Sequence, residues 1–207
     1  MSTGSVAVGH ALMAARDVSK MYDGFAAVNH VDLDIQAGSI HALIGPNGAG
    51  KSTFLNMLGG QLLPTSGEIT FEGMPLGASK PSRRALMGIG RSFQLTSIVP
   101  GFSCIENVII AAQAKRGLAR LLRLDSHPED VEFAQEQLQL VGLAAAADVP
   151  AELLAHGHQR QLEIAMALGA KPRVLLLDEP SSGMSGHERA ALPVLLRKIA
   201  GQATIVM

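Results

Sequence analysis

The sequence has no tryptophan, a single tyrosine and a single cysteine, and its charges almost cancel. Its 17 lysines and arginines stand against 18 aspartates and glutamates, for a formal net charge of −1 at pH 7. The chain therefore lacks the broad basic surface with which proteins bind nucleic acid irrespective of base sequence. The lone Cys104 cannot form an internal disulfide and fits a reducing cytosol. We interpret it as a small packing residue rather than a nucleophile.

Long apolar runs are also missing, although 47% of the 207 residues are hydrophobic. No stretch approaches the roughly 18 uninterrupted apolar residues of a membrane-spanning helix, so we expect the chain not to span a bilayer. Residues 1–20 lack a basic region followed by an apolar core, which is not the pattern of a secretory signal. The length fits one substantial core, or a main domain with a small satellite.

Strand and helix patterns alternate along much of the chain. Alternating or continuous apolar residues predict strands over 31–35, 40–44, 68–72 and 174–177, and the start of another strand at 203–207. We expect the strands at 40–44 and 174–177 to be buried. Helical patterns cover 51–58, about 159–170 and about 187–199. This interleaving predicts an α/β sheet. Amphipathic patterns at 105–124 and 128–143 have no strand between them and predict a helical insertion.

A glycine-rich loop, GPNGAGKST, joins the predicted strand at 40–44 to the predicted helix at 51–58, which is the context of a Walker A motif. Its glycines let successive backbone N–H groups point at a phosphate, and the helix N-terminus adds its dipole. Lys51 would bind the β and γ phosphates of a nucleotide, and the Ser52 hydroxyl would bind Mg²⁺. The predicted site residues are Gly45, Pro46, Asn47, Gly48, Ala49, Gly50, Lys51, Ser52 and Thr53.

A second motif, VLLLDEP, ends a predicted buried strand at Asp178 and Glu179. A carboxylate at the end of a buried parallel strand lies beside the phosphate loop, so Asp178 can hold Mg²⁺ directly or through water. Glu179 can then polarise the water that attacks the γ phosphate. The two motifs together predict a nucleotide-hydrolysing site.

Walker A alone fits GTPases, kinases and many ATPases. The order GPNGAGKST, RSFQ, LLAHGHQRQLEIA and LLLDEPSSGMS, however, resembles the ATP-binding subunit of ABC transporters from about Leu12 to Met207. The resemblance implies a P-loop NTPase fold, with a mainly parallel sheet, an N-terminal antiparallel β portion and a helical insertion. It predicts one domain over 1–207, with a core at 12–93 and 155–207 and a helical subdomain at 94–154.

The resemblance also assigns residues outside the two Walker motifs. Tyr22 matches the aromatic residue that stacks on adenine, although an aromatic between two strands is more often a packing residue. Gln94 in RSFQ matches the Q-loop glutamine, which contacts Mg²⁺ and the attacking water and senses the membrane subunit. Ser185 stands in the D-loop where an aspartate is common.

The stretch LLAHGHQRQ resembles the ABC signature, Leu-Ser-Gly-Gly-Gln, at Leu154, Ala155, His156, Gly157 and His158. In the family this loop reaches the γ phosphate of ATP held by the other subunit of a head-to-tail dimer. The alanine cannot donate the hydrogen bond of the usual serine, worth roughly 1.5 to 3 kcal/mol when the partner is charged. The two histidines stand two positions apart in a predicted loop, unlike the i, i+4 pair of a helical zinc site, and we interpret them as polar contacts.

Within the family, RSFQLTSIVPGFSCIENVIIAA and QRQLEIAMAL are similar to subunits of branched-chain amino-acid importers. This implies an ATPase at the cytoplasmic face of the membrane, with ATP and Mg²⁺ as cofactors. Its expected partners are a second ATPase subunit, membrane permeases and, indirectly, an external substrate-binding protein, with no nucleic acid. A switch histidine normally follows the strand that begins at 203–207, so we hypothesise a truncated gene model or a fragment. A catalytically weak ATP-binding regulator and a soluble ABC ATPase that acts outside transport remain alternatives.

Overall fold

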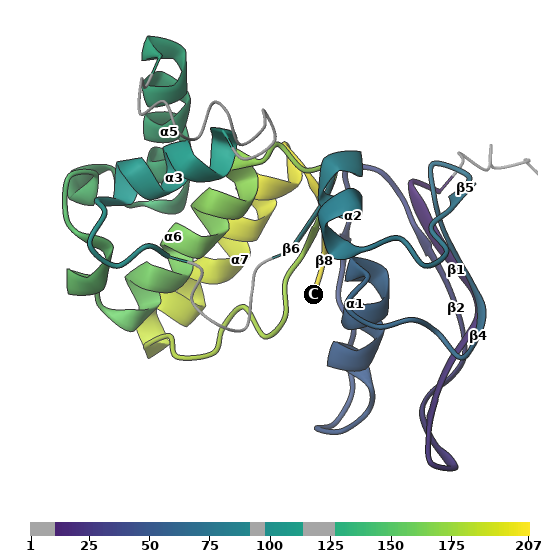
Figure 1. Cartoon of the computed structure of the whole chain (residues 1–207). Coiled ribbons are helices and arrows are strands. Elements are labelled where there is room, and N and C mark those ends of the chain that lie inside the picture. The colour runs from purple at the N-terminus through teal and green to yellow at the C-terminus, as the bar shows by residue number, and fades with distance from the viewer. Residues whose placement is uncertain (1–10, 92–97, 114–126) are drawn as a thin grey trace, which may run out of the picture.

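The computed structural model describes residues 11–91, 98–113 and 127–207. The fold has two four-stranded sheets, with α1 (Lys51–Gly59) between them and further helices on the far side of the second sheet (Figure 1). The first sheet is antiparallel and has the strand order β2-β1-β4-β5, and the second is parallel with the order β3-β8-β7-β6. The fold is the expected α/β architecture with an antiparallel β portion.

The antiparallel sheet consists of β1 (Met13–Tyr22), β2 (Phe25–Ile35), β4 (Ser66–Phe71) and β5 (Met74–Pro75). Asp23 and Gly24 join β1 to β2, and both have positive φ, 44° and 86°. A two-residue turn with two positive φ angles matches the twist of an antiparallel hairpin, so Tyr22 pairs directly with Phe25.

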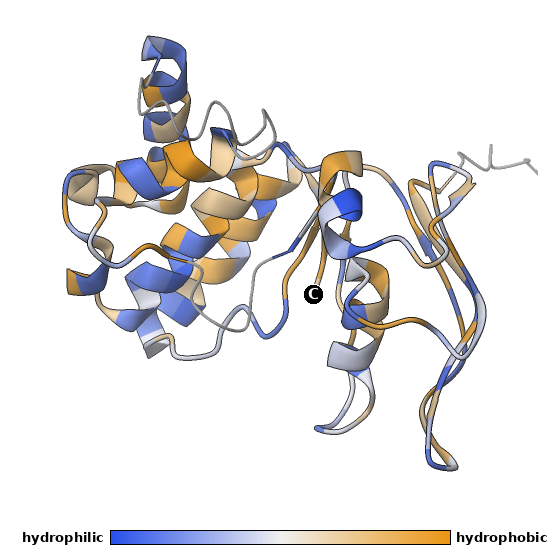
Figure 2. Ribbon diagram, in the orientation of Figure 1, coloured by the Kyte–Doolittle hydropathy of each residue, from blue (hydrophilic) through white to orange (hydrophobic). Residues whose placement is uncertain are grey.

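The parallel sheet consists of β3 (Ile40–His41), β6 (Ile89–Arg91), β7 (Val174–Leu176) and β8 (Thr204–Val206). Successive side chains of β7 enter different cores: Val174 and Leu176 pack with the antiparallel sheet and α1 (Lys51–Gly59), whereas Leu175 packs with the helices on the other face. This is the period-two alternation of a strand covered on both sides. Figure 2 shows the corresponding orange segments along these strands and in the helices that cover them.

Helices on the far face of the parallel sheet form the larger hydrophobic cluster. They are α3 (Cys104–Gln113), α5 (Pro128–Val141), α6 (His156–Gly169) and α7 (Gly186–Ala200). Two 3₁₀ turns, Ala144–Ala146 and Ala151–Leu153, connect α5 to α6. In the described part of 98–154 the only β pairing is a single bridge between Ser103 and Pro150, so this region is helical as expected.

The predicted buried strand at 40–44 is wrong in extent and burial. Only Ile40–His41 is a strand, and it pairs with β8 on one side alone among the described residues. Ile40 is 39% exposed and Ile44 is 93% exposed. Three strands and one helix were not predicted, namely β1, β5, β6 and α2 (Pro81–Met87), which precedes β6.

Candidate nucleotide-binding site

The phosphate loop leaves the β3 segment and enters α1, as the sequence predicted. Gly48 and Gly50 have left-handed backbone angles, with φ of 81° and 83°. Gly50 is the N-cap residue of α1, and its carbonyl accepts a hydrogen bond from the Phe54 N–H at 2.8 Å. The loop residues 45–49 are exposed and residues 50–53 are half-buried. The first N–H groups of a helix have no partner within the helix, so the start of α1 is a place where an anion can bind.

Lys51 folds back over this loop. Its Nζ donates to the carbonyl oxygens of Gly45 at 2.8 Å and Pro46 at 2.7 Å. These contacts hold the ammonium group at the mouth of the loop, beside the N-terminus of α1. Positive charge from the lysine and from the helix dipole therefore concentrates at one place, which suits a polyphosphate.

Ser52 and Asp178 join the two predicted Walker motifs. The Ser52 Oγ donates to Asp178 Oδ1 at 3.0 Å, although the residues lie 126 positions apart. Asp178 is 4% exposed and follows β7 at the carboxyl edge of the parallel sheet. The oxygen pair matches the hydroxyl and carboxylate donors that Mg²⁺ prefers.

Glu179 lies at the surface directly after the buried Asp178. Its backbone has φ of 45°, a left-handed conformation that is uncommon for a residue with a Cβ. The Glu179 carbonyl accepts a hydrogen bond from the Ser182 N–H at 3.0 Å, which closes a turn. This strained turn carries the carboxylate out of the core and into solvent at the edge of the site.

Three residues that hold Asp178 in place were not predicted. Arg91 Nη2 donates to Asp178 Oδ2 at 3.2 Å, and its Nη1 donates to Asn56 Oδ1. Arg160 Nη2 donates to the main-chain oxygen of Asp178 at 2.7 Å. Both arginines stand inside quoted motifs, RSFQ and HGHQRQ, and an arginine on a buried strand or helix face requires a partner. In the sequence, this need for a partner was the one sign that the two arginines take part in the site.

The signature-like residues lie where α6 begins. Ala155 is the N-cap residue, with extended backbone angles and no side-chain cap hydrogen bond. The helix starts at His156, earlier than the predicted start near 159, so both histidines lie in its first turn and not in a loop. In the part of the chain that the structure describes, no group of three or more His, Cys, Asp or Glu side chains is arranged to hold a metal.

Gly157 lies against the first turn of α7. A Cβ added to Gly157 would lie 2.0 Å from Glu188 Oε1. Glu188 also forms a capping box with Ser185, the predicted D-loop residue, whose backbone N–H donates to Glu188 Oε2 at 2.8 Å. The hydrogen bonds from the Ser185 hydroxyl and backbone lower the pKa of Glu188, and charge on His158 contributes less. The signature-like turn and the D-loop therefore share one carboxylate.

The remaining predicted residues lie apart from this cluster. Tyr22 ends β1 at the hairpin tip, is 44% exposed, and has the Lys20 Nζ 5.3 Å from its ring centroid. Leu154 packs against the helical core, which lies on the other face of the parallel sheet from α1. Gln94 lies outside the described residues.

A groove of about 430 Å³ borders the Asp178 cluster between α2, α3 and α6. Its walls are mostly small or apolar, and include Pro81, Ala85, Ile89, Ala111 and Met166. Two charged residues also line it, Arg91 and Glu163. Glu163 Oε2 accepts a hydrogen bond from Arg160 Nη1 at 2.7 Å, so both charged residues connect the groove to Asp178.

Comparison with known proteins finds close relatives over most of the chain. A family model described as "ABC transporter" matches residues 28–182. The chain is 36% identical over 195 residues to the high-affinity branched-chain amino acid transport ATP-binding protein LivG of Salmonella typhimurium, covering 91% of the chain and 76% of LivG. It is 34% identical over 205 residues to the ribose import ATP-binding protein RbsA 1 of Streptomyces coelicolor, covering 99% of the chain and 39% of that protein.

Solved structures agree with the fold. An ATP-binding cassette of an ABC transporter in its ADP conformation aligns with a TM-score of 0.82 at 25% identity, over 94% of this chain and 79% of that one. A dimeric cassette in a post-hydrolysis state with bound ADP and Pi aligns with a TM-score of 0.77 at 27% identity, over 94% and 86% of the two chains. Sequence and fold therefore lead to the same family.

Proposed function

Because the chain belongs to the ABC transporter family, we propose that it is the ATP-binding subunit that energises an importer of branched-chain or related amino acids. As a member of this family it is an ATPase. The observation that carries the proposal for this chain is the 3.0 Å hydrogen bond from Ser52 to Asp178, which brings the phosphate loop and the second carboxylate motif into one site.

The proposed chemistry divides among few residues. Lys51 and the N–H groups of the loop would bind the β and γ phosphates. Ser52 and Asp178 would hold Mg²⁺, which offsets the negative charge on those phosphates when bound. Glu179 would polarise the attacking water, and its exposed position after the buried Asp178 leaves it open to a nucleotide. Tyr22 would stack on adenine, with one side of its ring beside Lys20.

A second subunit would complete the site. Within one chain, the signature-like residues lie at the N-terminus of α6, on the face of the parallel sheet opposite to α1. They are Leu154, Ala155, His156, Gly157 and His158. We propose that this N-terminus, with its free N–H groups, binds the γ phosphate of ATP held by the partner chain of a head-to-tail dimer. The dimeric post-hydrolysis cassette supports this arrangement by likeness.

Membrane permeases would be the mechanical partners. No helix among the described residues is long and apolar enough to cross a membrane. We propose that the chain works at the cytoplasmic face of a membrane, where a permease helix enters the groove between α2, α3 and α6. The small and apolar walls of that groove suit a helix. By the family resemblance, Gln94 would contact the bound Mg²⁺ and the attacking water. Through the permeases the chain would act with an external substrate-binding protein.

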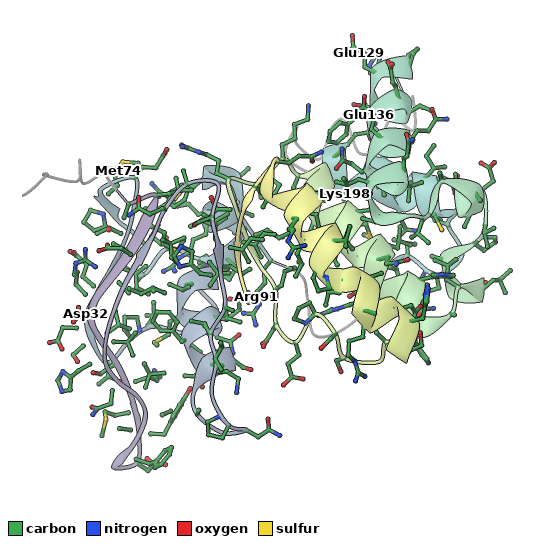
Figure 3. The ribbon with its side chains drawn as sticks, turned by 180° about the vertical axis from the view of Figure 1, so that it is seen from behind. Asp32, Met74, Arg91, Glu129, Glu136 and Lys198 are labelled. Carbon is green, nitrogen blue, oxygen red and sulfur yellow. The ribbon has the colours of Figure 1, made fainter. Side chains whose placement is uncertain are left out.

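The catalytic role can be tested with Glu179→Gln, which keeps the shape of the side chain and removes the base. We expect ATP turnover to fall at least 100-fold while ATP binding is retained. Glu129→Gln is the matched control, because Glu129 is an exposed glutamate at the far end of α5 (Figure 3). Equal turnover in wild type and Glu179→Gln would contradict the role of Glu179.

The cargo can be tested separately. Deleting the gene should lower uptake of labelled leucine, and restoring the full chain should recover it. Uptake of labelled ribose in the same cells is the discriminating measurement, since a relative at 34% identity is a ribose import protein. Loss of ribose uptake with normal leucine uptake would replace the amino-acid assignment.

A further inference from the structure

Arg91 connects three elements of the nucleotide site from a buried position. Its side chain is 8% exposed, and that of Asp178 is 3% exposed. One arm of the guanidinium donates to Asp178 Oδ2 and the other donates to Asn56 Oδ1 on α1. Figure 3 places Arg91 between α1 and the helical half of the molecule.

Asn56, which accepts a hydrogen bond from Arg91, lies on the same face of α1 as Ser52, which donates to Asp178. Ser52 and Asn56 lie four residues apart, and residues with this spacing are neighbours on a helix surface. The carboxylate of Asp178 is therefore bound at both oxygens: Oδ1 by the Ser52 hydroxyl and Oδ2 by Arg91, which Asn56 in turn orients. A planar guanidinium with two occupied arms fixes geometry in a way that a lysine cannot.

The backbone of the same aspartate is held from the opposite side. Arg160 of α6 donates to the Asp178 main-chain oxygen and to Glu163. Since Glu163 and Arg91 both line the groove between α2, α3 and α6, the groove has two polar connections to Asp178. Burial lowers the pKa of Arg91, and the charge of Asp178 and its hydrogen bond oppose this shift.

We propose that Arg91, oriented by Asn56, is a positioning residue that fixes the Asp178 carboxylate with Oδ1 directed at Ser52, and so sets the geometry in which Mg²⁺ binds. The inference rests on the proposed function, because it presupposes that Ser52 and Asp178 hold the ion. It adds a residue that touches neither nucleotide nor metal and acts through Asp178.

A positioning role and a purely electrostatic role of Arg91 predict opposite changes in Mg²⁺-dependent ATP binding when Arg91 is removed. A cation beside a metal-binding carboxylate repels Mg²⁺, so its removal alone would strengthen Mg²⁺-dependent ATP binding. Mg²⁺ demands nearly ideal octahedral geometry. If Arg91 positions the carboxylate, its removal lets Asp178 rotate and weakens the Mg²⁺-dependent part of binding.

The test is ATP affinity of the full chain, measured by calorimetry with EDTA and again with Mg²⁺. For Arg91→Met we expect wild-type affinity in EDTA, and a gain on adding Mg²⁺ that is roughly tenfold smaller than in wild type, near the cost of one charge-assisted hydrogen bond. Arg91→Lys should not restore the gain, because it keeps the charge and loses one arm. Arg83→Met, which removes an exposed arginine of α2, is the control.

Asn56→Ala removes the second anchor of Arg91 without leaving a buried charge unpaired, so it tests the proposal even if Arg91→Met fails to fold. For Asn56→Ala we expect the gain in ATP affinity on adding Mg²⁺ to fall below that of wild type, by less than in Arg91→Met. A wild-type Mg²⁺ gain in Asn56→Ala, full recovery by Arg91→Lys, or a larger gain in Arg91→Met would each overturn the proposal. If wild type shows no Mg²⁺-dependent ATP binding at all, the proposed function fails instead.

Discussion

Gly50 and Ala27 approach so closely that a Cβ added to Gly50 would lie 2.0 Å from the carbonyl oxygen of Ala27. Ala27 belongs to β2, so the end of the phosphate loop rests on the antiparallel sheet. Gly50 also has φ of 83°, where a side chain is strained. The shape of the loop therefore depends on a tertiary contact as well as on local backbone freedom.

Substitutions at Gly48 and Gly50 separate the effect of the left-handed backbone from that of the contact with Ala27. Gly48 has nearly the same φ, 81°, but a Cβ there would meet nothing within 4 Å. Gly48→Ala should therefore cost only the left-handed strain of about 1 kcal/mol. Gly50→Ala must also move backbone, so we expect a larger fall in unfolding free energy and loss of ATP binding. Urea denaturation and ATP titration of both variants measure this, and equal effects would show that the Ala27 contact is unimportant.

Arg84 is a buried residue that caps the C-terminus of α1. It is 1% exposed, and its Nη1 donates to the carbonyls of Met57 at 2.6 Å and Leu58 at 2.9 Å, in the last turn of α1. Burial lowers the pKa of Arg84, and the negative end of the α1 dipole compensates part of its charge.

Replacing Arg84 by methionine keeps most of the volume and leaves those carbonyls without their donor. Each unsatisfied buried group costs about 1 to 3 kcal/mol, so we expect the free energy of unfolding to fall by about 2 to 5 kcal/mol. The neighbouring Arg83→Met should change it by less than about 0.5 kcal/mol, because Arg83 is exposed. Similar denaturation midpoints for the two variants would show that the cap contributes little.

Local patterns predicted the elements whose signals are local. The helix at 51–58, the helix at 187–199 and the strand at 68–72 were found within a few residues of α1, α7 and β4. β1 was missed because register shifts interrupt its pairing between Ala15 and Met21, so its side chains do not alternate cleanly. β6, with three residues, is too short for a periodic pattern to be visible.

The partners of Asp178 could not be read from the sequence for a different reason. Arg91 meets Asp178 across 87 positions and Asn56 across 35. No period links residues at such separations, and only the tertiary fold, in which β6 pairs with β7 and packs against α1, brings them together. Motif spacing therefore found Ser52 and Asp178 but not the side chains that hold them.

The start of α6 shows how a missing signal misleads. A helix usually announces its N-cap with Ser, Thr, Asp or Asn, and here the N-cap is Ala155, so the predicted start fell about three residues late. The same residue stands where the family signature has serine. One substitution, Ala155→Ser, therefore bears on both the helix cap and the proposed contact with the partner's γ phosphate.

We expect Ala155→Ser to raise the free energy of unfolding by about 1 kcal/mol without nucleotide, since its hydroxyl can accept a hydrogen bond from an N–H of the first turn. With ATP it should also raise turnover, because the same hydroxyl can donate to the γ phosphate across the dimer. Thermal denaturation without nucleotide and steady-state ATPase assays report the two effects separately. Ala145→Ser, at an exposed alanine of a 3₁₀ turn, is the control. If stability rises and turnover does not change, the hydroxyl acts only as a helix cap. If turnover rises without a gain in stability, the hydroxyl acts only on the partner's nucleotide.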